Sequence, residues 1–250
     1  MEYIYVTKEN IEKEHICCAI SNNTDCQVVS KKEWLRGRFD EGLVFLKADI
    51  RGKCFIQYVP AENAWTPINA DGYMYIDCLW VSGQYKGKGY AKELLEACVE
   101  DAKKKGMQGL VVLSSEKKLP FLSDPKFLSY HGFKVADKAN PSYVLYYLPF
   151  EADHKVPQFK EQVKSPAINE KGWVLYYSAA CPFTAKYVPL IEGIAKEKNI
   201  LFQAIKLSST KEAQAAPAPF TIYSLFQDGK FVTNEILSEK KFEKLVLGQE

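Results

Sequence analysis

A strand, a glycine-rich turn and a helix follow one another without a break, and this succession constrains the fold more than any other feature. The run GYMYIDCLWV (72–81) is rich in β-branched and aromatic residues, which favours a strand. The run YAKELLEACVEDAKKKG (90–106) repeats apolar residues with the spacing of an amphipathic helix. The turn between them, within VSGQYKGKGYAKELL (81–95), alternates lysine with glycine from Lys86 to Gly89. Positive charge is unfavourable at a helix N-terminus, so we expect an anion to bind there.

The composition of this turn favours a phosphate group as the anion. The first main-chain N–H groups of a helix have no internal acceptors, and Gly87 and Gly89 let the backbone approach a ligand closely. Lys86 and Lys88 add charge that a phosphate neutralises. The turn is neither a Walker loop nor a GxGxxG motif. The alternative, a tight turn with no ligand, leaves the flanking lysines unexplained.

The first 150 residues otherwise read as a mixed sheet with one strong helix. Strand-like runs lie at 41–49, 52–60, 72–81, 109–115 and 142–150. The first three follow each other closely, which indicates an antiparallel meander. A short helix over 124–133 is predicted by Asp124 as N-cap, Pro125 in the first turn and Gly132 as its stop.

Residues 151–170 are charged, contain two prolines and lack an apolar period, so we interpret them as a linker. After this segment the sequence again predicts regular elements. Strands are expected at 172–178 and 200–208, with a helix over 181–199. A hairpin over 220–237 turns at Asp228-Gly229, and a closing helix over 238–248 is capped by Ser238. We therefore expect an α/β (α+β) fold. A domain over 1–150 has a mixed sheet with flanking helices, and a smaller α/β domain occupies 171–250.

Composition excludes several classes of function. Hydrophobic residues make up 47% and charged residues 26% of the 250 residues, which is ordinary for a globular protein with a real core. The net charge of +2 gives no support to a general role on nucleic acid or a membrane surface. No apolar run approaches the roughly 20 residues of a membrane span. The charged start MEYIYVTKENIEKEH lacks the apolar core of a signal peptide, so we expect a cytoplasmic protein.

The seven cysteines and three histidines show no spacing typical of a metal site. His15, His131 and His154 are far apart in the sequence and have no CxxC or HxxxH partner. The odd number of cysteines does not form a small disulfide framework, so we read them as free thiols in a reducing compartment. We predict no metal site.

The turn at 81–95 resembles motif A of the GNAT superfamily of N-acetyltransferases, Arg/Gln-x-x-Gly-x-Gly/Ala. Registers beginning at Gln84 and at Lys86 both fit; the second, with lysine in place of arginine, also places Val81 at the end of the strand. The order of elements over 1–150 is similar to that of the superfamily. The resemblance implies acetyl-CoA as co-substrate. It places the pantetheine arm on the backbone around Leu79, Trp80 and Val81, and the pyrophosphate on Lys86, Gly87, Lys88, Gly89, Tyr90 and Ala91.

The resemblance also implies a general base on the strand before the turn. Alternation puts Tyr75, Asp77, Leu79 and Val81 on one side of that strand, and Asp77 is the candidate base. The alternative for Asp77 is a carboxylate that merely bonds a sheet bulge or neighbouring backbone. The usual acid is a tyrosine four residues before the glycine of Gly-Phe, a position that Leu128 occupies here. Tyr130 is the candidate substitute.

An aromatic stretch over 55–75 offers Tyr58, Glu62 and Trp65 for an acceptor pocket. The same residues could form a hairpin tip that packs on the second domain. Nothing in them identifies a substrate.

The second half has the order of elements of a thioredoxin-like domain. YYSAACPFT resembles the active-site entrance of that fold, and APAPFTIYSLFQDGKFV resembles its cis-proline strand and hairpin, with Pro217 or Pro219 as the proline. The helix N-terminus predicts a lowered pKa for Cys181, while Thr184 replaces the usual second cysteine. Together the two halves resemble bacterial GNAT proteins with a C-terminal YoaP-like domain.

Three functions follow from these resemblances. The leading one is an N-acetyltransferase that moves acetyl from acetyl-CoA to a small-molecule or peptide amine, with a second domain that helps to bind the acceptor. Nucleic acid, membrane and metal are not expected as partners, and a homodimer is left open. The second is a monothiol redox or thiol-ligand-handling protein that works through Cys181, with acyl-CoA as regulator; the alternative for Cys181 is a small residue at a helix start. The third is a non-catalytic acyl-CoA sensor, which Leu128 at the acid position favours.

Overall fold

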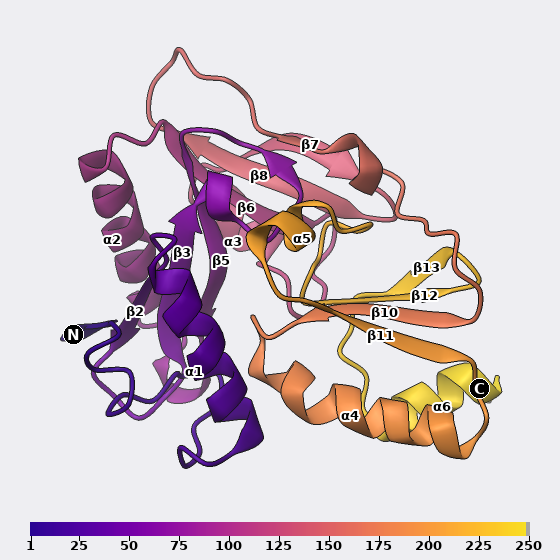
Figure 1. The fold of residues 1–250 in the computed structure, drawn as a ribbon. Helices are drawn as coiled ribbons and strands as arrows, with labels where there is room; N and C mark the ends of the chain where they lie inside the picture. Colours follow the sequence, from indigo (N-terminus) through magenta and orange to yellow (C-terminus); the bar gives the residue numbers. More distant parts are fainter. Residues whose placement is uncertain (249–250) are drawn as a thin grey trace.

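The computed structural model describes residues 1–248, and each half of this chain builds its own sheet (Figure 1). The sheet of the first half has the strand order β1-β2-β3-β5-β6-β8-β7. These strands are β1 (Tyr3–Val6), β2 (Val44–Ala48), β3 (Cys54–Pro60), β5 (Tyr73–Val81), β6 (Gly109–Ser115), β7 (Lys134–Ala139) and β8 (Tyr143–Pro149). The predicted meander is confirmed, because β2, β3 and β5 pair antiparallel in sequence order.

Two helices cover opposite faces of this sheet. The helix α2 (Tyr90–Lys104) buries Leu94, Leu95, Cys98 and Ala102 in one core. The helix α1 (Cys26–Phe39) buries Trp34 and Leu35 in the other core. The short helix α3 (Pro125–Tyr130) begins at the predicted cap, where Asp124 accepts a hydrogen bond from the Lys126 N–H, and it packs on the α2 face. The sheet therefore separates an α1 face from an α2 face.

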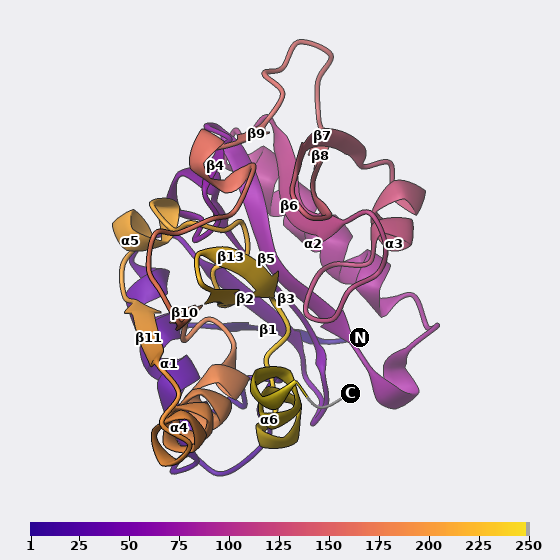
Figure 2. The same ribbon diagram turned by 90° about the vertical axis from the view of Figure 1, so that its right-hand side faces the viewer.

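The second half has a four-stranded sheet in the order β11-β10-β12-β13. Its elements are β10 (Trp173–Ser178), α4 (Pro182–Glu197), β11 (Phe202–Leu207), α5 (Thr210–Gln214), β12 (Tyr223–Gln227), β13 (Lys230–Thr233) and α6 (Glu239–Leu247). Strands β10 and β11 are parallel, and the others pair antiparallel. The predicted hairpin turn is confirmed, because Asp228 and Gly229 both adopt a positive φ. Figure 2 shows α4 and α6 side by side on one face of this sheet.

The segment between the halves is more ordered than a linker. Its strand β9 (Gln158–Phe159) pairs with β4 (Ile68–Asn69), and a 3-10 turn, η3 (Glu161–Val163), follows. Phe159 and Val163 are buried in the core on the α1 face. The segment therefore belongs to the packed structure, although its composition predicts an irregular connection.

The two halves share one continuous core on the α1 face, and Figure 2 shows the second half in front of the first sheet. Helices α1 and α4 contact each other. Trp65 donates to Thr210 at 3.0 Å, and Gln214 donates to the Ala64 carbonyl at 2.6 Å. The second half is thus fixed to the face of the sheet that carries α1.

Several predictions about elements need correction. Sequence patterning missed α1, β1 and β7, and the reason for α1 is that its buried face includes three cations: Lys31, Lys32 and Arg38. Ser238 precedes α6, but its side chain makes no capping bond. The cis-proline expectation is wrong, because the cis peptide bond in residues 1–248 is Asn140–Pro141.

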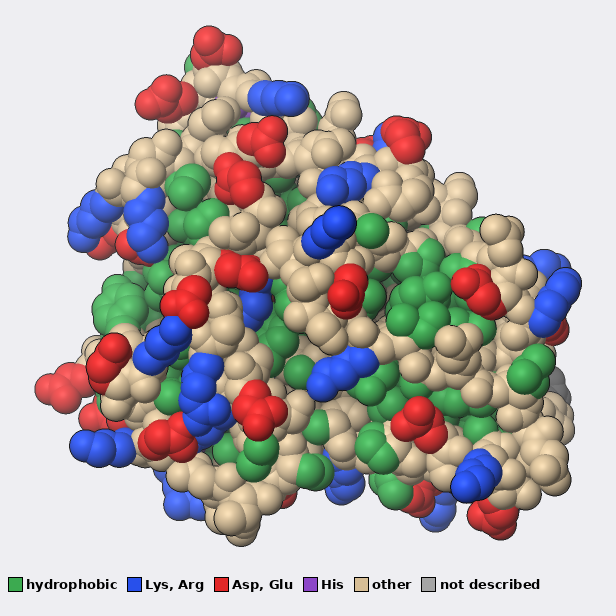
Figure 3. Space-filling model, viewed as in Figure 1, with side chains coloured by type: hydrophobic (Ala, Val, Ile, Leu, Met, Phe, Trp, Pro, Cys, Tyr) green, Lys and Arg blue, Asp and Glu red, His purple; other side chains and the backbone are tan. Residues whose placement is uncertain are grey.

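The surface carries both signs of charge in close alternation over the face shown in Figure 3. None of the helices in residues 1–248 combines the length and apolar composition that crossing a bilayer requires.

Candidate active site at the split between β5 and β6

The sheet of the first half opens between its two parallel strands. β5 pairs with β6 only from Tyr73 to Ile76, opposite Gly109 to Val112. Beyond this point β6 continues to pair with β8 alone among the residues described. The peptide groups of β5 over 77–81 are therefore free on that side to bond an extended, amide-containing ligand, as an added strand would. Leu79, Trp80 and Val81, the residues predicted to hold such a ligand, lie in this unpaired stretch.

The glycine-rich turn follows directly at the end of β5. Gly87 and Gly89 have φ values of +73° and +85°, and Gly89 is the N-cap of α2. These values lie in the left-handed region that only glycine adopts readily, so the turn depends on both glycines. A Cβ atom added to either glycine would meet no atom within 4 Å. The turn therefore borders open space.

The main chain of this turn fits a diphosphate. Within the described residues, the N–H groups from Gly87 to Ala91 have no hydrogen-bond partner, whereas Lys92 and Glu93 already donate to the Gly89 carbonyl. Lys86 and Lys88 are exposed and form no ion pair with any described carboxylate. An anionic ligand binds to unpaired N–H groups at a helix N-terminus, and exposed cations beside them favour it further. Tyr90 and Ala91 contribute through the first turn of α2.

A β-bulge places Asp77 at the mouth of the split. On β3, Gln57 lies opposite Cys78 and Tyr58 lies opposite Ile76, so Asp77 is the extra residue on β5. The bulge reverses the alternation of the strand. Tyr75 packs in the core on the α1 face, but Leu79 and Val81 pack with the α2 core. The prediction that one side of the strand carries all four residues is therefore wrong for Leu79 and Val81, whereas Tyr75 does share the side of Asp77.

The carboxylate of Asp77 faces the α1 side. It accepts a 3.0 Å hydrogen bond from Gln57 Nε2, and Gln57 is itself buried in the sheet. Burial raises the pKa of Asp77, and the charges of Arg38 and Lys31, with the bond from Gln57, oppose that rise. A carboxyl group whose pKa is raised is a better proton acceptor near neutral pH than an ordinary one. Asp77 is therefore both the candidate base and the residue at the sheet bulge, so the two interpretations of this carboxylate apply to the same side chain.

A buried lysine that the sequence did not single out completes this environment. Lys31 is 1% exposed, and its ammonium donates to Gln57 Oε1 at 2.8 Å and to the Ala180 carbonyl at 2.6 Å. The same ammonium lies 4.0 Å from the centre of the Trp34 ring, a favourable cation–π contact. The Ala180 carbonyl belongs to the loop between β10 and α4, so Lys31 connects both halves of the chain. A lone lysine on a helix gives no sequence signal for such a role.

Tyr130 makes no contact with Asp77. Its side chain is 86% exposed, and its ring contacts His131. Helix α3, which carries it, packs through Leu128 on the α2 face, whereas Asp77 faces the α1 side. The role of Tyr130 as the acid stays a prediction.

Cys181 lies at the N-cap of α4, as predicted, but it is not an activated thiol. Burial raises its pKa to about 12 and outweighs the helix N-terminus, so the expected lowering is wrong. Thr184 Oγ1 donates to the Ser178 carbonyl at 2.7 Å and to the Cys181 carbonyl at 2.8 Å. Thr184 therefore holds the turn around Cys181 instead of supplying a second thiol.

The residues of the aromatic stretch over 55–75 are packed in different parts of the structure and do not line one pocket. The Trp65 ring lies edge-to-face on Trp34 at 5.5 Å and against the second half. Tyr58 is buried on the opposite face of the sheet, and Glu62 accepts a 2.7 Å hydrogen bond from the Gly72 N–H. The hairpin-tip alternative is therefore confirmed for Trp65.

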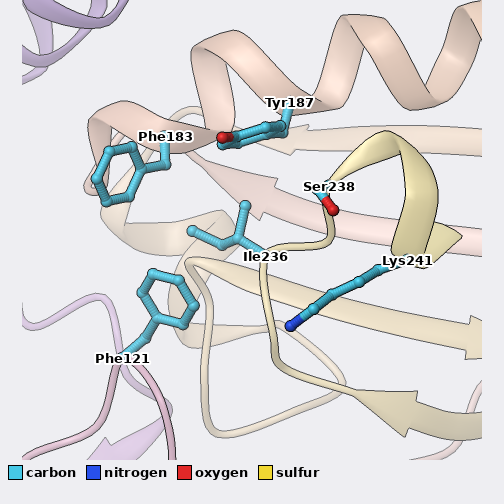
Figure 4. A pocket seen from close by; sticks show the side chains of 6 residues that line it. All are labelled: Phe121, Phe183, Tyr187, Ile236, Ser238 and Lys241. Carbon is cyan, nitrogen blue, oxygen red and sulfur yellow. The ribbon is translucent and has the colours of Figure 1, made fainter.

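A cavity of about 210 Å³ lies instead between the two halves (Figure 4). It is lined by Phe121, Phe183, Tyr187, Ile236, Ser238 and Lys241. Phe121 comes from the segment after β6, and its ring centre lies 6.5 Å from that of Phe183 at the start of α4. Phe121 also adopts a φ of +65°, a strained conformation for a large side chain. This wall of the cavity was not found from the sequence, because it joins residues far apart along the chain.

In residues 1–248, no group of three or more His, Cys, Asp or Glu side chains is arranged to hold a metal ion.

Known proteins resemble both halves of the chain. A family model described as the acetyltransferase (GNAT) family matches residues 9–120, and a model described as YoaP-like matches residues 202–244. The chain is 50% identical to the uncharacterized N-acetyltransferase YoaP of Bacillus subtilis (strain 168) over 247 residues, which are 98% of each chain.

Solved structures of acetyltransferases are similar at much lower identity. The PaiA N-acetyltransferase from Thermoplasma acidophilum, in complex with coenzyme A, is 17% identical with a TM-score of 0.41 and covers 60% of this chain and 100% of its own. An acetyltransferase of the GNAT family from Staphylococcus aureus Mu50 is 16% identical with a TM-score of 0.42 and covers 60% of this chain and 99% of its own.

Proposed function

Since this chain belongs to the GNAT family of acetyltransferases and carries a YoaP-like C-terminal domain, we propose that it acetylates a small-molecule or peptide amine at the split between β5 and β6. Acetyl-CoA supplies an activated acyl group as a thioester. The observation that carries the proposal is the continuity of the unpaired β5 edge over 77–81 with the unpaired N–H groups from Gly87 to Ala91. One ligand with an amide-containing arm and a diphosphate fits both.

The residues of the turn hold the donor. The N–H groups from Gly87 to Ala91 bond the diphosphate oxygens, and Lys86 and Lys88 neutralise their charge. The peptide groups of Leu79, Trp80 and Val81 bond the amide-containing arm along β5. These contacts fix the acyl carbon near the point where β5 leaves β6, which is the position of Asp77.

Asp77 serves as the base in this proposal. The amine attacks the acyl carbon, its nitrogen gives up a proton to the Asp77 carboxylate, and the bond from the acyl carbon to sulfur breaks. Gln57 holds the carboxylate through its 3.0 Å bond. No acid is assigned for the departing thiolate, because the exposed Tyr130 has no bond to a described residue that orients its hydroxyl, so the rate depends on positioning and on the activated donor.

The second half contributes the acceptor side. The cavity between the halves has an apolar wall formed by Phe121, Phe183 and Tyr187, and Ser238 and Lys241 form its polar part. A volume of about 210 Å³ exceeds the ~150 Å³ of an apolar cavity that accommodates a benzene molecule. We place an apolar or aromatic part of the acceptor there.

The thiol function has less support than acetyl transfer. A reactive cysteine needs thiolate character, and burial keeps Cys181 in the thiol form near neutral pH. The sensor function differs from the proposal only in turnover.

The test is acetyl transfer to a panel of amines that includes polyamines, amino acids, aromatic amines and short peptides. Release of free CoA thiol is followed together with the mass increase of one acetyl group on the amine. Product in at least one reaction is the expected result. Tight binding of acetyl-CoA with no product from any amine would instead favour the sensor function.

A further inference from the structure

We propose that Lys31 is a positioning residue for Asp77 that acts from the boundary between the two halves. In this proposal, Lys31 keeps the partly buried Asp77 carboxylate ionised and holds the β10–α4 loop against the first sheet. The inference rests on the proposed function for the importance of Asp77, and the linkage itself is open to a test that needs no activity.

An unbroken set of short hydrogen bonds carries the linkage. Ala180 accepts from Lys31 at 2.6 Å, Lys31 donates to Gln57 Oε1 at 2.8 Å, and Gln57 Nε2 donates to Asp77 Oδ2 at 3.0 Å. Two hydrogen bonds fix the orientation of the Gln57 amide, because its oxygen accepts from the Lys31 ammonium and its nitrogen donates to the Asp77 carboxylate. A change at Lys31 therefore changes the bond that Asp77 accepts.

The charge of Lys31 has no carboxylate bonded to it among the residues described; its direct acceptors are neutral oxygens. A buried ammonium needs such compensation, since removing a charge from water costs several kcal/mol. Burial lowers the pKa of Lys31; Cys18 opposes this most, followed by Asp77, the carboxylate one amide away. Buried Lys31 and partly buried Asp77 carry opposite charges and are separated by Gln57.

Other groups also face Asp77. They are Arg38 from α1, Cys78 beside it on β5 and Tyr75 on the same strand; Cys18, from the segment before α1, and Cys181, from the second half, act on the pKa of Lys31 and of Cys78. Arg38 has the stronger effect on the pKa of Asp77, but it also forms an ion pair with Glu41 and donates to Thr210 at 2.8 Å. Lys31 is distinct because its second acceptor, Ala180, lies in the loop that covers this face.

The position of this loop gives the linkage a function. The loop leads into α4 and to Phe183, which lines the acceptor cavity. An acceptor that binds at Phe183 stabilises the docked loop. The docked loop in turn supplies the oxygen that keeps Lys31 beside Gln57. Binding of the acceptor and orientation of the base are thereby coupled.

The matched variants are Lys31→Met and Lys32→Met in the full chain. Lys32 is the next residue on α1 and is 3% exposed, but it donates to Asn23 and to the Glu12 carbonyl instead of the Asp77 network. Methionine retains most of the length of either lysine as an unbranched apolar chain and removes its charge. Lys31→Arg restores the charge as a third variant.

The experiment is a titration of Asp77 by carbon-13 NMR in selectively labelled protein, with the resonance assigned from Asp77→Asn. Lys31→Met should raise the pKa of Asp77 by about one unit, the lower end for loss of a nearby opposite charge. Lys32→Met should leave it unchanged, and Lys31→Arg should return it toward the wild type. Hydrogen exchange at amides around residue 180 should become faster only in Lys31→Met.

An unchanged or lowered pKa of Asp77 in Lys31→Met would overturn the inference. If the acid limb of the pH profile of kcat/KM shifts to higher pH in Lys31→Met together with the NMR pKa of Asp77, the linkage affects catalysis. If the wild type acetylates no amine while the titration shifts as expected, the proposed function fails and the linkage stands.

Discussion

Gln57 donates a 3.0 Å hydrogen bond to Asp77 at the bulge where β5 stops pairing with β6. The bond ties the candidate base to the neighbouring strand at the point where the pairing of β5 with β6 ends. Asp77 faces the α1 side, as Tyr75 does two residues before it, and the bulge places Leu79 and Val81 on the α2 face.

Replacing Asp77 by asparagine should lower kcat by about 100-fold or more, because general-base catalysis typically contributes that much. Binding of acetyl-CoA should not change, since asparagine has the same shape and can accept the bond from Gln57. Steady-state kinetics with the best amine of the panel measures the effect. Asp153→Asn, in an exposed loop, is the matched control. Activity of Asp77→Asn within a few-fold of wild type would remove Asp77 from the mechanism.

The pH dependence of kcat/KM should show two ionisations in the wild type. Burial raises the pKa of Asp77 above its usual 3.8, and the carboxyl group accepts a proton only when it is ionised. The acceptor amine must also be neutral. Log kcat/KM should therefore rise with slope two at pH values below both pKa values and with slope one between them. Asp77→Asn should show slope one throughout, and an unchanged profile in that variant would contradict the assignment.

Removing one aromatic ring from the cavity should weaken the acceptor and spare the donor. Phe183→Ala should raise KM for an apolar amine by about tenfold or more, the range for apolar groups in a pocket. KM for acetyl-CoA should stay within a factor of two or so of the wild type. Leu190→Ala, at an exposed position of the same helix outside the cavity, is the control. Equal effects of both variants on acceptor KM would show that the cavity does not bind the acceptor.

Cys181 should react slowly with alkylating reagents. Its pKa of about 12 leaves almost no thiolate near neutral pH, whereas Cys26 is exposed at the start of α1. Iodoacetamide labelling read by mass spectrometry should modify Cys26 well before Cys181. Acetyl transfer should also persist in Cys181→Ser. Rapid labelling of Cys181, or loss of transfer in that variant, would revive the thiol function.

The docking of the halves should depend strongly on Trp65, which is buried between Trp34 and Thr210. Trp65→Ala should reduce the free energy of unfolding by about 3–5 kcal/mol, as for other large core truncations. Thr210→Ala, which removes the acceptor of both Trp65 and buried Arg38 and leaves both rings, should cost about 1–3 kcal/mol. Urea unfolding measures the free energy of unfolding of both variants. A smaller decrease in Trp65→Ala than in Thr210→Ala would show that Trp65 does not belong to the shared core.

The sequence predicted the elements that follow a clear period or a strong cap. The helix after the glycine-rich turn, the meander and the turn at Asp228-Gly229 are all confirmed. Local rules suffice there because the signal lies in adjacent residues. The same rules missed α1, because an apolar period does not register the buried cations Lys31 and Arg38, which find their acceptors in distant segments.

The candidate site was predictable only in its donor half. The turn from Lys86 to Gly89 contains its own signal, but the α2-facing side of Leu79 and Val81 depends on a bulge that strict alternation cannot foresee. Likewise, the lowered pKa expected for Cys181 considered the helix N-terminus and not the burial by the first half. Both errors come from contacts between residues far apart in the sequence.

Calorimetric titration of acetyl-CoA into wild type, Gly87→Glu and Gly89→Glu tests the central claim most directly. Gly193→Glu is the control, because that exposed glycine in α4 has no positive φ and would add the same charge away from the turn. A carboxylate beside the unpaired N–H groups should weaken binding by about tenfold or more, since hydrogen bonds to a charged group contribute about 1.5–3 kcal/mol each. Unchanged affinity in both turn variants would contradict the assignment of the diphosphate to the head of α2.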